Sequence, residues 1–155
     1  MKTRSILLSL ALCVIAVAIS SAMDSPMMGT WKLNEAKSKI PAGAPKNTTV
    51  VYEAAGDQIK VTVDGMDASG TATHNEWTCK FDGKDYPVTG DLISDTRAYK
   101  QLNDHTVTFT GKKGGKTAMN GRVAISADGK TRTVTTTGTD AQNKKVHVTA
   151  VYEKQ

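Results

Sequence analysis

The sequence predicts an all-β protein, an antiparallel up-and-down meander barrel of about ten strands preceded by a signal peptide. Three observations support this prediction. Short segments rich in Val, Thr, Tyr and Ile recur from Thr48 to the C-terminus. Asp-Gly and Gly-Gly pairs separate many of them, and glycine supplies the positive φ angles that tight hairpins need. Within the segments apolar and polar residues alternate, so each strand has one face to bury.

The N-terminus has the features of a secretory signal peptide over residues 1–22. Lys2 and Arg4 precede an apolar run at residues 6–19, and the small residues Ser20 and Ala22 follow it. This run is shorter than the roughly 20 residues that cross a bilayer comfortably. We therefore expect cleavage after Ala22, export to the periplasm or the extracellular space, and no stable membrane insertion of the mature chain.

Residues 23–155 form the predicted barrel domain, which has 155 − 22 = 133 residues and is large enough for one core. The formal net charge of the whole chain is +5, and loss of the two basic leader residues lowers it to 5 − 2 = +3. This mild excess lies in no basic run and on no aromatic platform, so we expect no nucleic-acid partner. We expect a monomer rather than an oligomer.

Cys79 is the only cysteine left after cleavage, so the core rather than a set of disulfides must hold the fold. It alternates with Trp77 and Phe81 along one predicted strand. We interpret Cys79 as a small buried residue. The alternative is a reactive thiol.

The strands can be placed in order along the chain. We expect them at residues 30–34, 48–53, 58–64, 71–81, 84–89, 96–102, 106–112, 116–126, 131–139 and 145–153. Short turns join antiparallel neighbours, so the topology is a meander, and closure into a barrel removes its two exposed edges. Residues 34–47 are rich in Pro and Gly, so we expect a loop there with at most one helical turn at residues 35–39.

Gly29 and Trp31 open the first predicted strand, in the sequence GTWKL. A large indole at this position can plug the closed end of a barrel, while glycine lets the backbone bend close beneath it. Because aromatic residues make up only 5% of the chain, we favour the plug. The alternative is that Trp31 is one more core aromatic.

GTWKL at residues 29–33 and AVYEK at residues 150–154 resemble the two ends of the intracellular fatty-acid-binding proteins, a ten-stranded branch of the lipocalin-like (calycin) superfamily. The whole sequence, with GTWKLNEAKSK and DGKDYPVTG, also resembles exported bacterial lipocalin-like proteins. The resemblance implies a barrel that encloses a small hydrophobic ligand. In fatty-acid-binding proteins an Arg-x-Tyr pair on the last strand holds the carboxylate. Here Tyr152 matches the tyrosine, Ala150 replaces the arginine, and the loop at residues 34–47 replaces the helical lid.

A barrel of about eight to ten strands is wide enough for side chains or one small ligand. We choose Tyr152, Tyr99, Trp77 and Arg97 as candidate ligand-binding residues. The alternative interpretation makes the aromatic residues core fillers and Arg97 a surface residue. Nothing in the sequence indicates a cofactor.

Metal-binding signals are weak. His74 and Glu76 share a strand face, but a metal site needs three or four ligands, and His105 and His147 are distant in sequence. We therefore expect no metal site.

Catalytic signals are also weak. The sequence has no Gly-x-Ser-x-Gly elbow, and nothing places a base beside Cys79. Asp82, Asp85, Asp91 and Asp95 lie around turns, where aspartate commonly caps backbone N–H groups. We predict no catalytic residues.

These observations predict an exported, non-enzymatic binding protein for a small apolar or amphipathic ligand. The alternative is a barrel with a filled interior that acts through its surface, as an inhibitor or an envelope interaction module. An enzyme is the third hypothesis. A fold alone does not decide among them, because one fold supports many functions.

Overall fold

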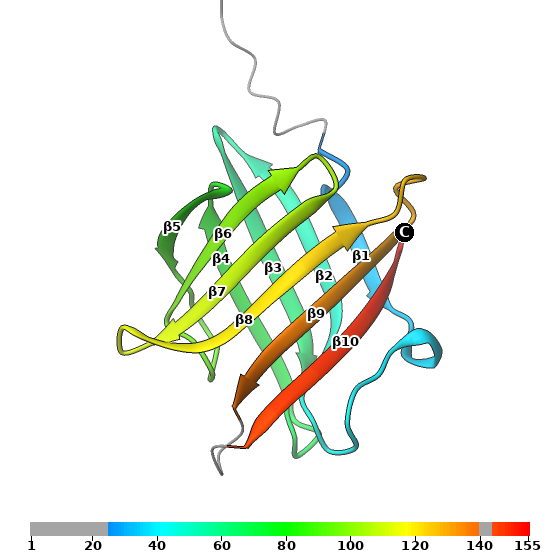
Figure 1. Ribbon diagram of the computed structural model, residues 1–155, viewed down its shortest axis with the longest axis vertical. Helices are drawn as coiled ribbons and strands as arrows, with labels where there is room; N and C mark the ends of the chain where they lie inside the picture. The colour runs from blue at the N-terminus through cyan, green and yellow to red at the C-terminus, as the bar shows by residue number, and fades with distance from the viewer. Residues whose placement is uncertain (1–24, 140–143) are drawn as a thin grey trace, which may run out of the picture.

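The computed structural model describes residues 25–139 and 144–155, so the predicted signal peptide lies outside the described residues. The chain forms strands and one short 3-10 helix, η1 (Figure 1). In chain order these are β1 (Gly29–Leu33), η1 (Glu35–Lys37), β2 (Lys46–Ala55), β3 (Gln58–Met66), β4 (Ala72–Cys79), β5 (Asp82–Pro87), β6 (Thr96–Asn103), β7 (Thr106–Lys113), β8 (Lys116–Ile125), β9 (Thr131–Thr139) and β10 (Lys145–Lys154).

The ten strands form a single antiparallel sheet in the order β4-β3-β2-β1-β10-β9-β8-β7-β6-β5. Consecutive strands pair with each other except β4 and β5, and the first strand also pairs with the last, with Trp31 opposite Lys154. The sheet therefore rolls into a nearly closed barrel (Figure 1). This confirms the predicted all-β, up-and-down meander of ten strands, and η1 lies where a helical turn was expected. None of the helices in the described part of the chain is long and apolar enough to cross a membrane.

The edges of the sheet, β4 and β5, meet along a seam. Glu76 and Thr89 bridge this seam through two backbone hydrogen bonds of 3.0 Å each. In the same register the next hydrogen-bonded pair would be Thr78 and Pro87, but proline has no N–H to donate. Pro87 therefore leaves one hydrogen bond of the ladder unmade. Among the described residues the two edges are joined by the single bridge between Glu76 and Thr89, so the barrel is nearly rather than fully closed.

The inward side chains of the strands pack into one core. Its buried apolar members are Met27, Trp31, Val50, Tyr52, Ile59, Val61, Val63, Trp77, Cys79, Tyr99, Val107, Phe109, Val123, Ile125, Ala150 and Tyr152. The alternation predicted from the sequence thus corresponds to inward and outward faces. Cys79 is a free, fully buried thiol, and burial raises its pKa to about 11. Because the thiolate is the reactive form, this environment supports the interpretation of Cys79 as a packing residue.

Trp31 lies at the end of the barrel where the described chain begins and ends. Its indole is fully buried, and Nε1 donates a hydrogen bond of 2.9 Å to the carbonyl oxygen of Met27. The Lys154 ammonium lies 5.2 Å from the centroid of the ring. Gly29 has φ +103°, where other residues are strained, and a Cβ there would come within 3.3 Å of Lys154. Trp31 therefore lies at the end of the barrel, where the predicted plug would lie. The role of Trp31 and Gly29 as a plug stays a prediction.

Replacement of Trp31 should destabilise the barrel strongly. Trp31→Ala removes a fully buried indole and its hydrogen bond, so we expect the free energy of unfolding to fall by about 3–5 kcal/mol. Trp31→Phe should lose less, because it keeps an aromatic ring. Urea denaturation measures both. The control is Leu102→Ala, since Leu102 is 52% exposed; a loss as large as that of Trp31→Ala would contradict this account.

Candidate functional site

The four candidate residues chosen from the sequence all lie inside the barrel. Tyr152 on β10, Tyr99 and Arg97 on β6, and Trp77 on β4 are all buried. Arg97 is therefore not a surface residue. The structure places these side chains in two groups, each built around a buried arginine. Ligand binding by these residues stays a prediction.

The first group is centred on Arg97, which forms a buried ion pair. Its Nη2 lies 2.6 Å from Oδ2 of Asp91, and its Nε donates to Oγ of Ser94 at 3.3 Å. The guanidinium carbon lies 4.5 Å from the ring centroid of Trp77, which in turn stacks on Tyr99 at 5.9 Å. Because its charge is already paired, Arg97 is poorly placed to serve a ligand.

Asp91 belongs to the connection between β5 and β6, where the sequence indicated only a turn residue. Burial raises the pKa of its carboxyl group, but the nearby charge of Arg97 and hydrogen bonds from Ser94 and Ile93 outweigh burial. The net effect is a lowered pKa. The carboxylate therefore stays ionised next to Arg97 at neutral pH.

The second group is centred on Arg132 of β9, which lies directly opposite Tyr152 in the β9–β10 register. Arg132 is 4% exposed. Its Nη2 donates a hydrogen bond of 2.9 Å to the hydroxyl of Tyr52, which comes from β2. The guanidinium carbon lies 4.8 Å from the ring centroid of Tyr152 and 5.4 Å from that of Tyr52. Aromatic faces thus surround this cation.

Arg132 differs from Arg97 because it has no counter-charge among the described residues. Its Nε and Nη1 are buried and have no hydrogen-bond partner in the described part of the chain. Burial opposes the charge, but the surrounding tyrosines outweigh it, so the pKa of Arg132 is raised. Burial also raises the pKa of Tyr99 and of Tyr152, so both hydroxyls are neutral and neither is an anion. Among the residues that the structure describes, this buried guanidinium therefore has no negative partner.

Arg132 and Tyr52 were not among the residues chosen from the sequence. A signal was present, because Arg132 is two residues before Val134 and shares the face that a core-forming strand buries. Tyr52 shares its face with Val50 in the same way. The contact between Arg132 and Tyr52 joins residues 80 apart in sequence, and alternation within one strand does not predict such a contact.

Burial of the inward residues decreases from one end of the barrel to the other. Ile125, Arg132 and Tyr152 are neighbours in register and are all buried. At the opposite ends of the same strands, Met119 and Val146 both lie opposite Gly138 of β9. These two inward residues are only half-buried. The barrel is therefore more accessible at the end opposite Trp31.

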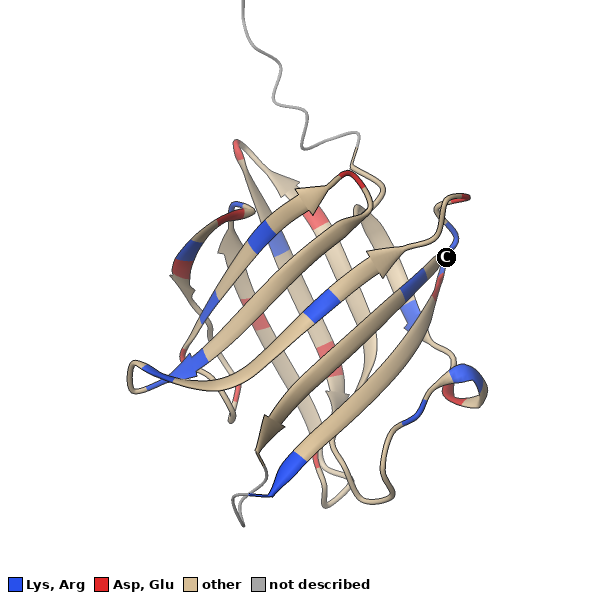
Figure 2. Ribbon diagram, viewed as in Figure 1, with Lys and Arg blue, Asp and Glu red and all other residues tan. Residues whose placement is uncertain are grey.

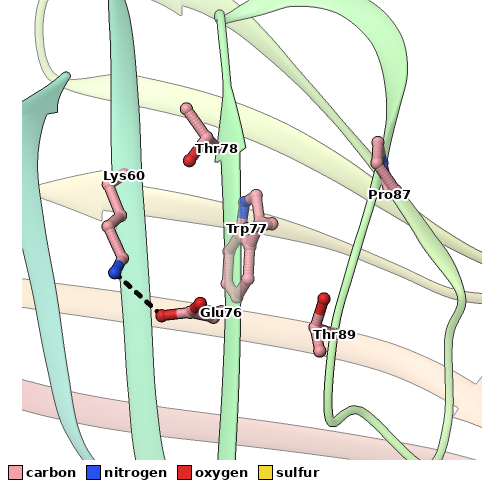
Figure 3. A pocket seen from close by; sticks show the side chains of 6 residues that line it. All are labelled: Lys60, Glu76, Trp77, Thr78, Pro87 and Thr89. Carbon is pink, nitrogen blue, oxygen red and sulfur yellow. Dashed lines mark ion pairs between the residues drawn. The ribbon is translucent and has the colours of Figure 1, made fainter.

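A pocket of about 260 Å³ lies along the seam between β4 and β5 (Figure 3). It is lined by Lys60, Glu76, Trp77, Thr78, Pro87 and Thr89. Lys60 and Glu76 form an ion pair of 2.9 Å across part of it. Trp77 is its only lining residue from the buried core. The pocket is thus a hollow in the barrel wall, where Pro87 interrupts the ladder, and it is smaller than the roughly 300 Å³ of typical small-molecule sites.

The two residues with metal-ligand spacing have other partners. Nδ1 of His74 lies 2.7 Å from Oδ1 of Asp64, and Glu76 pairs with Lys60. Within residues 25–139 and 144–155, no group of three or more His, Cys, Asp or Glu side chains is arranged to hold a metal ion.

No protein-family model matches the sequence, and a search among curated proteins also gives no match. The structure establishes a ten-stranded, nearly closed antiparallel barrel. This architecture is compatible with the lipocalin-like resemblance, and membership of that superfamily stays a prediction.

Loss of the Asp91 carboxylate should destabilise the protein in a pH-dependent way. Asp91→Asn leaves Arg97 buried without its anion, so we expect the free energy of unfolding to fall by about 3 kcal/mol at pH 7. The folded-state pKa of Asp91 lies below the ordinary value of 3.8. Its stabilisation is therefore present above that value and is lost as the pH falls through the folded-state pKa.

Urea denaturation at pH 7 and below pH 4 tests this expectation. The difference in the free energy of unfolding between the native protein and Asp91→Asn should be smaller at the lower pH. Asp85→Asn is the control, because Asp85 pairs with Lys112 at the surface and should contribute less than about 1 kcal/mol. A constant difference across this range would show that the charge of Asp91 is not what stabilises the fold.

Proposed function

We propose that the protein is an exported, non-enzymatic binding protein that holds a small amphipathic molecule inside its barrel. The observation that carries this proposal is the buried guanidinium of Arg132, whose Nε and Nη1 have no hydrogen-bond partner and which has no ion-pair partner among the described residues. Burying a charge without a partner is costly, and an anion that enters the barrel would offset that cost. The ligand therefore has an anionic head group.

Arg132 and its tyrosines suit a carboxylate head. Charge-assisted hydrogen bonds from a guanidinium to a carboxylate are among the stronger interactions that a protein makes. In the family that the sequence resembles, an arginine two residues before the tyrosine serves this purpose, and Ala150 occupies that position here. Arg132 lies opposite Tyr152 on the neighbouring strand. It would therefore supply the missing charge beside the matching tyrosine.

The rest of the core suits an apolar tail. Tyr99 stacks between Trp77 and Phe109, with ring centroids 5.9 and 5.4 Å apart. The inward residues Met119 and Val148, toward the end opposite Trp31, are half-buried and apolar. A tail that starts at Arg132 would run along these side chains toward the accessible end. Arg97 is assigned a structural role, because Asp91 already neutralises it.

Matched ligands separate the head group from the tail. Thermal unfolding of the purified protein should be followed with dodecanoate and with dodecanol, which share a tail. At about 100 times the dissociation constant a ligand adds about 2.7 kcal/mol to the stability of the folded state, which corresponds to a rise of several degrees in Tm. We expect this rise with dodecanoate and a smaller one with dodecanol.

Arg132→Met should abolish the preference for the acid, because it keeps the length of the side chain and removes its charge. The variant should fold at least as well as the native protein, since it removes an unpaired buried cation. The control is Arg122→Met on the neighbouring strand β8, where the side chain is exposed. An unchanged preference in Arg132→Met would contradict the proposed head-group site. A melting temperature that neither ligand changes would favour the alternative, a filled barrel that acts through its surface.

A further inference from the structure

The connection between β5 and β6 presents two apolar side chains to solvent. Leu92 is 74% exposed, more than any other large apolar residue in the described part of the chain, and its neighbour Ile93 is 47% exposed. Isolated exposed apolar residues are common on protein surfaces. Two in succession at the tip of a loop are a more specific feature, and we call Leu92 and Ile93 the apolar tip.

A buried network holds the apolar tip in place. Oδ1 of Asp91 accepts a hydrogen bond of 2.9 Å from the backbone N–H of Ile93. Its Oδ2 accepts hydrogen bonds from Arg97 and from Ser94, and Ser94 is fully buried. The residues on both sides of the tip are thus anchored in the barrel. A tip ordered in advance loses less entropy when it binds a partner.

The same connection is tied to the hairpin between β7 and β8. The backbone N–H of Asp95 donates to the carbonyl oxygen of Lys112, and Gly114 N–H donates to Oδ2 of Asp95, both at 2.8 Å. Lys113 and Lys116 of this hairpin are exposed. Neither forms an ion pair with any residue that the structure describes, whereas Lys112 pairs with Asp85. Two available ammonium groups therefore lie on the hairpin beside the tip, together with the carboxylate of Asp95.

The wall behind this hairpin is positively charged. Strands β6 to β9 contain no acidic residue, and Figure 2 shows basic positions along them without acidic ones. Their exposed basic residues include Lys100 and Arg122. The exposed basic residues on these strands thus add to the positive electrostatic potential of the hairpin lysines.

We propose that the apolar tip and the adjacent lysines dock the protein peripherally on a membrane surface that contains anionic lipids. Leu92 and Ile93 would enter the interface between head groups and acyl chains, and Lys113 and Lys116 would lie at the level of the lipid phosphates. Interfacial binding of this kind combines a small inserted apolar area with attraction to anionic lipids. It differs from the stable insertion that the sequence argues against.

A membrane suits this feature better than a protein partner. A stable protein interface buries about 800 Å² on each partner, which two side chains on a protruding loop cannot supply. The tip also lies at the end of the barrel opposite Trp31, where the inward residues are more accessible. Docking would therefore bring the accessible end of the barrel to the lipid surface. The inference does not depend on whether a ligand occupies the barrel.

Vesicle flotation tests the proposal with the purified protein after export. Vesicles of phosphatidylcholine with phosphatidylglycerol should bind the protein, and vesicles of pure phosphatidylcholine should bind it much less. Leu92→Ser with Ile93→Ser should weaken binding to the anionic vesicles by about tenfold, because it removes the inserted apolar area. Lys113→Gln with Lys116→Gln should weaken it by a similar factor of about ten.

Two matched controls separate the tip from general surface properties. Leu102→Ser changes an exposed leucine at the other end of β6, and Lys84→Gln removes a lysine whose side chain is 80% exposed on β5. Both variants should bind anionic vesicles like the native protein, and all variants should keep the native melting temperature. Three results would overturn the proposal: binding to neutral vesicles as strong as to anionic ones, undiminished binding by the tip variants, or no vesicle binding at all. The last result would leave the tip for a protein partner.

Discussion

The pairing of β1 with β10 is the contact on which the rest of the structure depends. Each hairpin of the meander forms from neighbouring segments, but this pair joins the two ends of the chain, with Leu33 opposite Tyr152. It turns two separate runs of strands, β1 to β4 and β5 to β10, into one continuous sheet. Only then can Tyr52 of β2 reach across to Arg132 of β9. Trp31 of β1 is fully buried next to this pairing, opposite Lys154.

The two buried arginines show how the connections between strands decide the role of a residue. Both lie on inward positions among aromatic side chains. The long connection before β6 turns Asp91 toward Arg97, so that charge is neutralised within the fold. The tighter turn before β9 also contains an aspartate, Asp128, but its carboxylate bonds to Ser126 and Lys130 in the turn itself. Arg132 therefore receives no anion from its own connection.

Much of the barrel could be predicted from the sequence because its signals are local. Turn glycines indicate where one strand is separated from the next, although the observed bounds differ from the predicted ones by a few residues. Alternation indicates which side chains face inward, as it does for Trp77, Tyr99 and Tyr152. Contacts between distant strands could not be predicted in the same way. The partners of Arg97 and Arg132 depend on register around the whole barrel. The seam depends on how the edges β4 and β5 meet, which is through a single bridge between Glu76 and Thr89. Neither relation is visible within a single segment.

Under the proposed function, the lack of a counter-charge for Arg132 among the described residues would link folding to binding of the ligand. The hydrogen bond to Tyr52 and the faces of two tyrosines offset part of the cost of burying its charge. They are neutral groups, however, so the remaining cost lowers the stability of the empty barrel. A ligand that brings a negative charge would add to stability both by its own binding and by neutralising this cation. Without such a ligand, the barrel is therefore less stable than one of the same packing that lacks the buried charge.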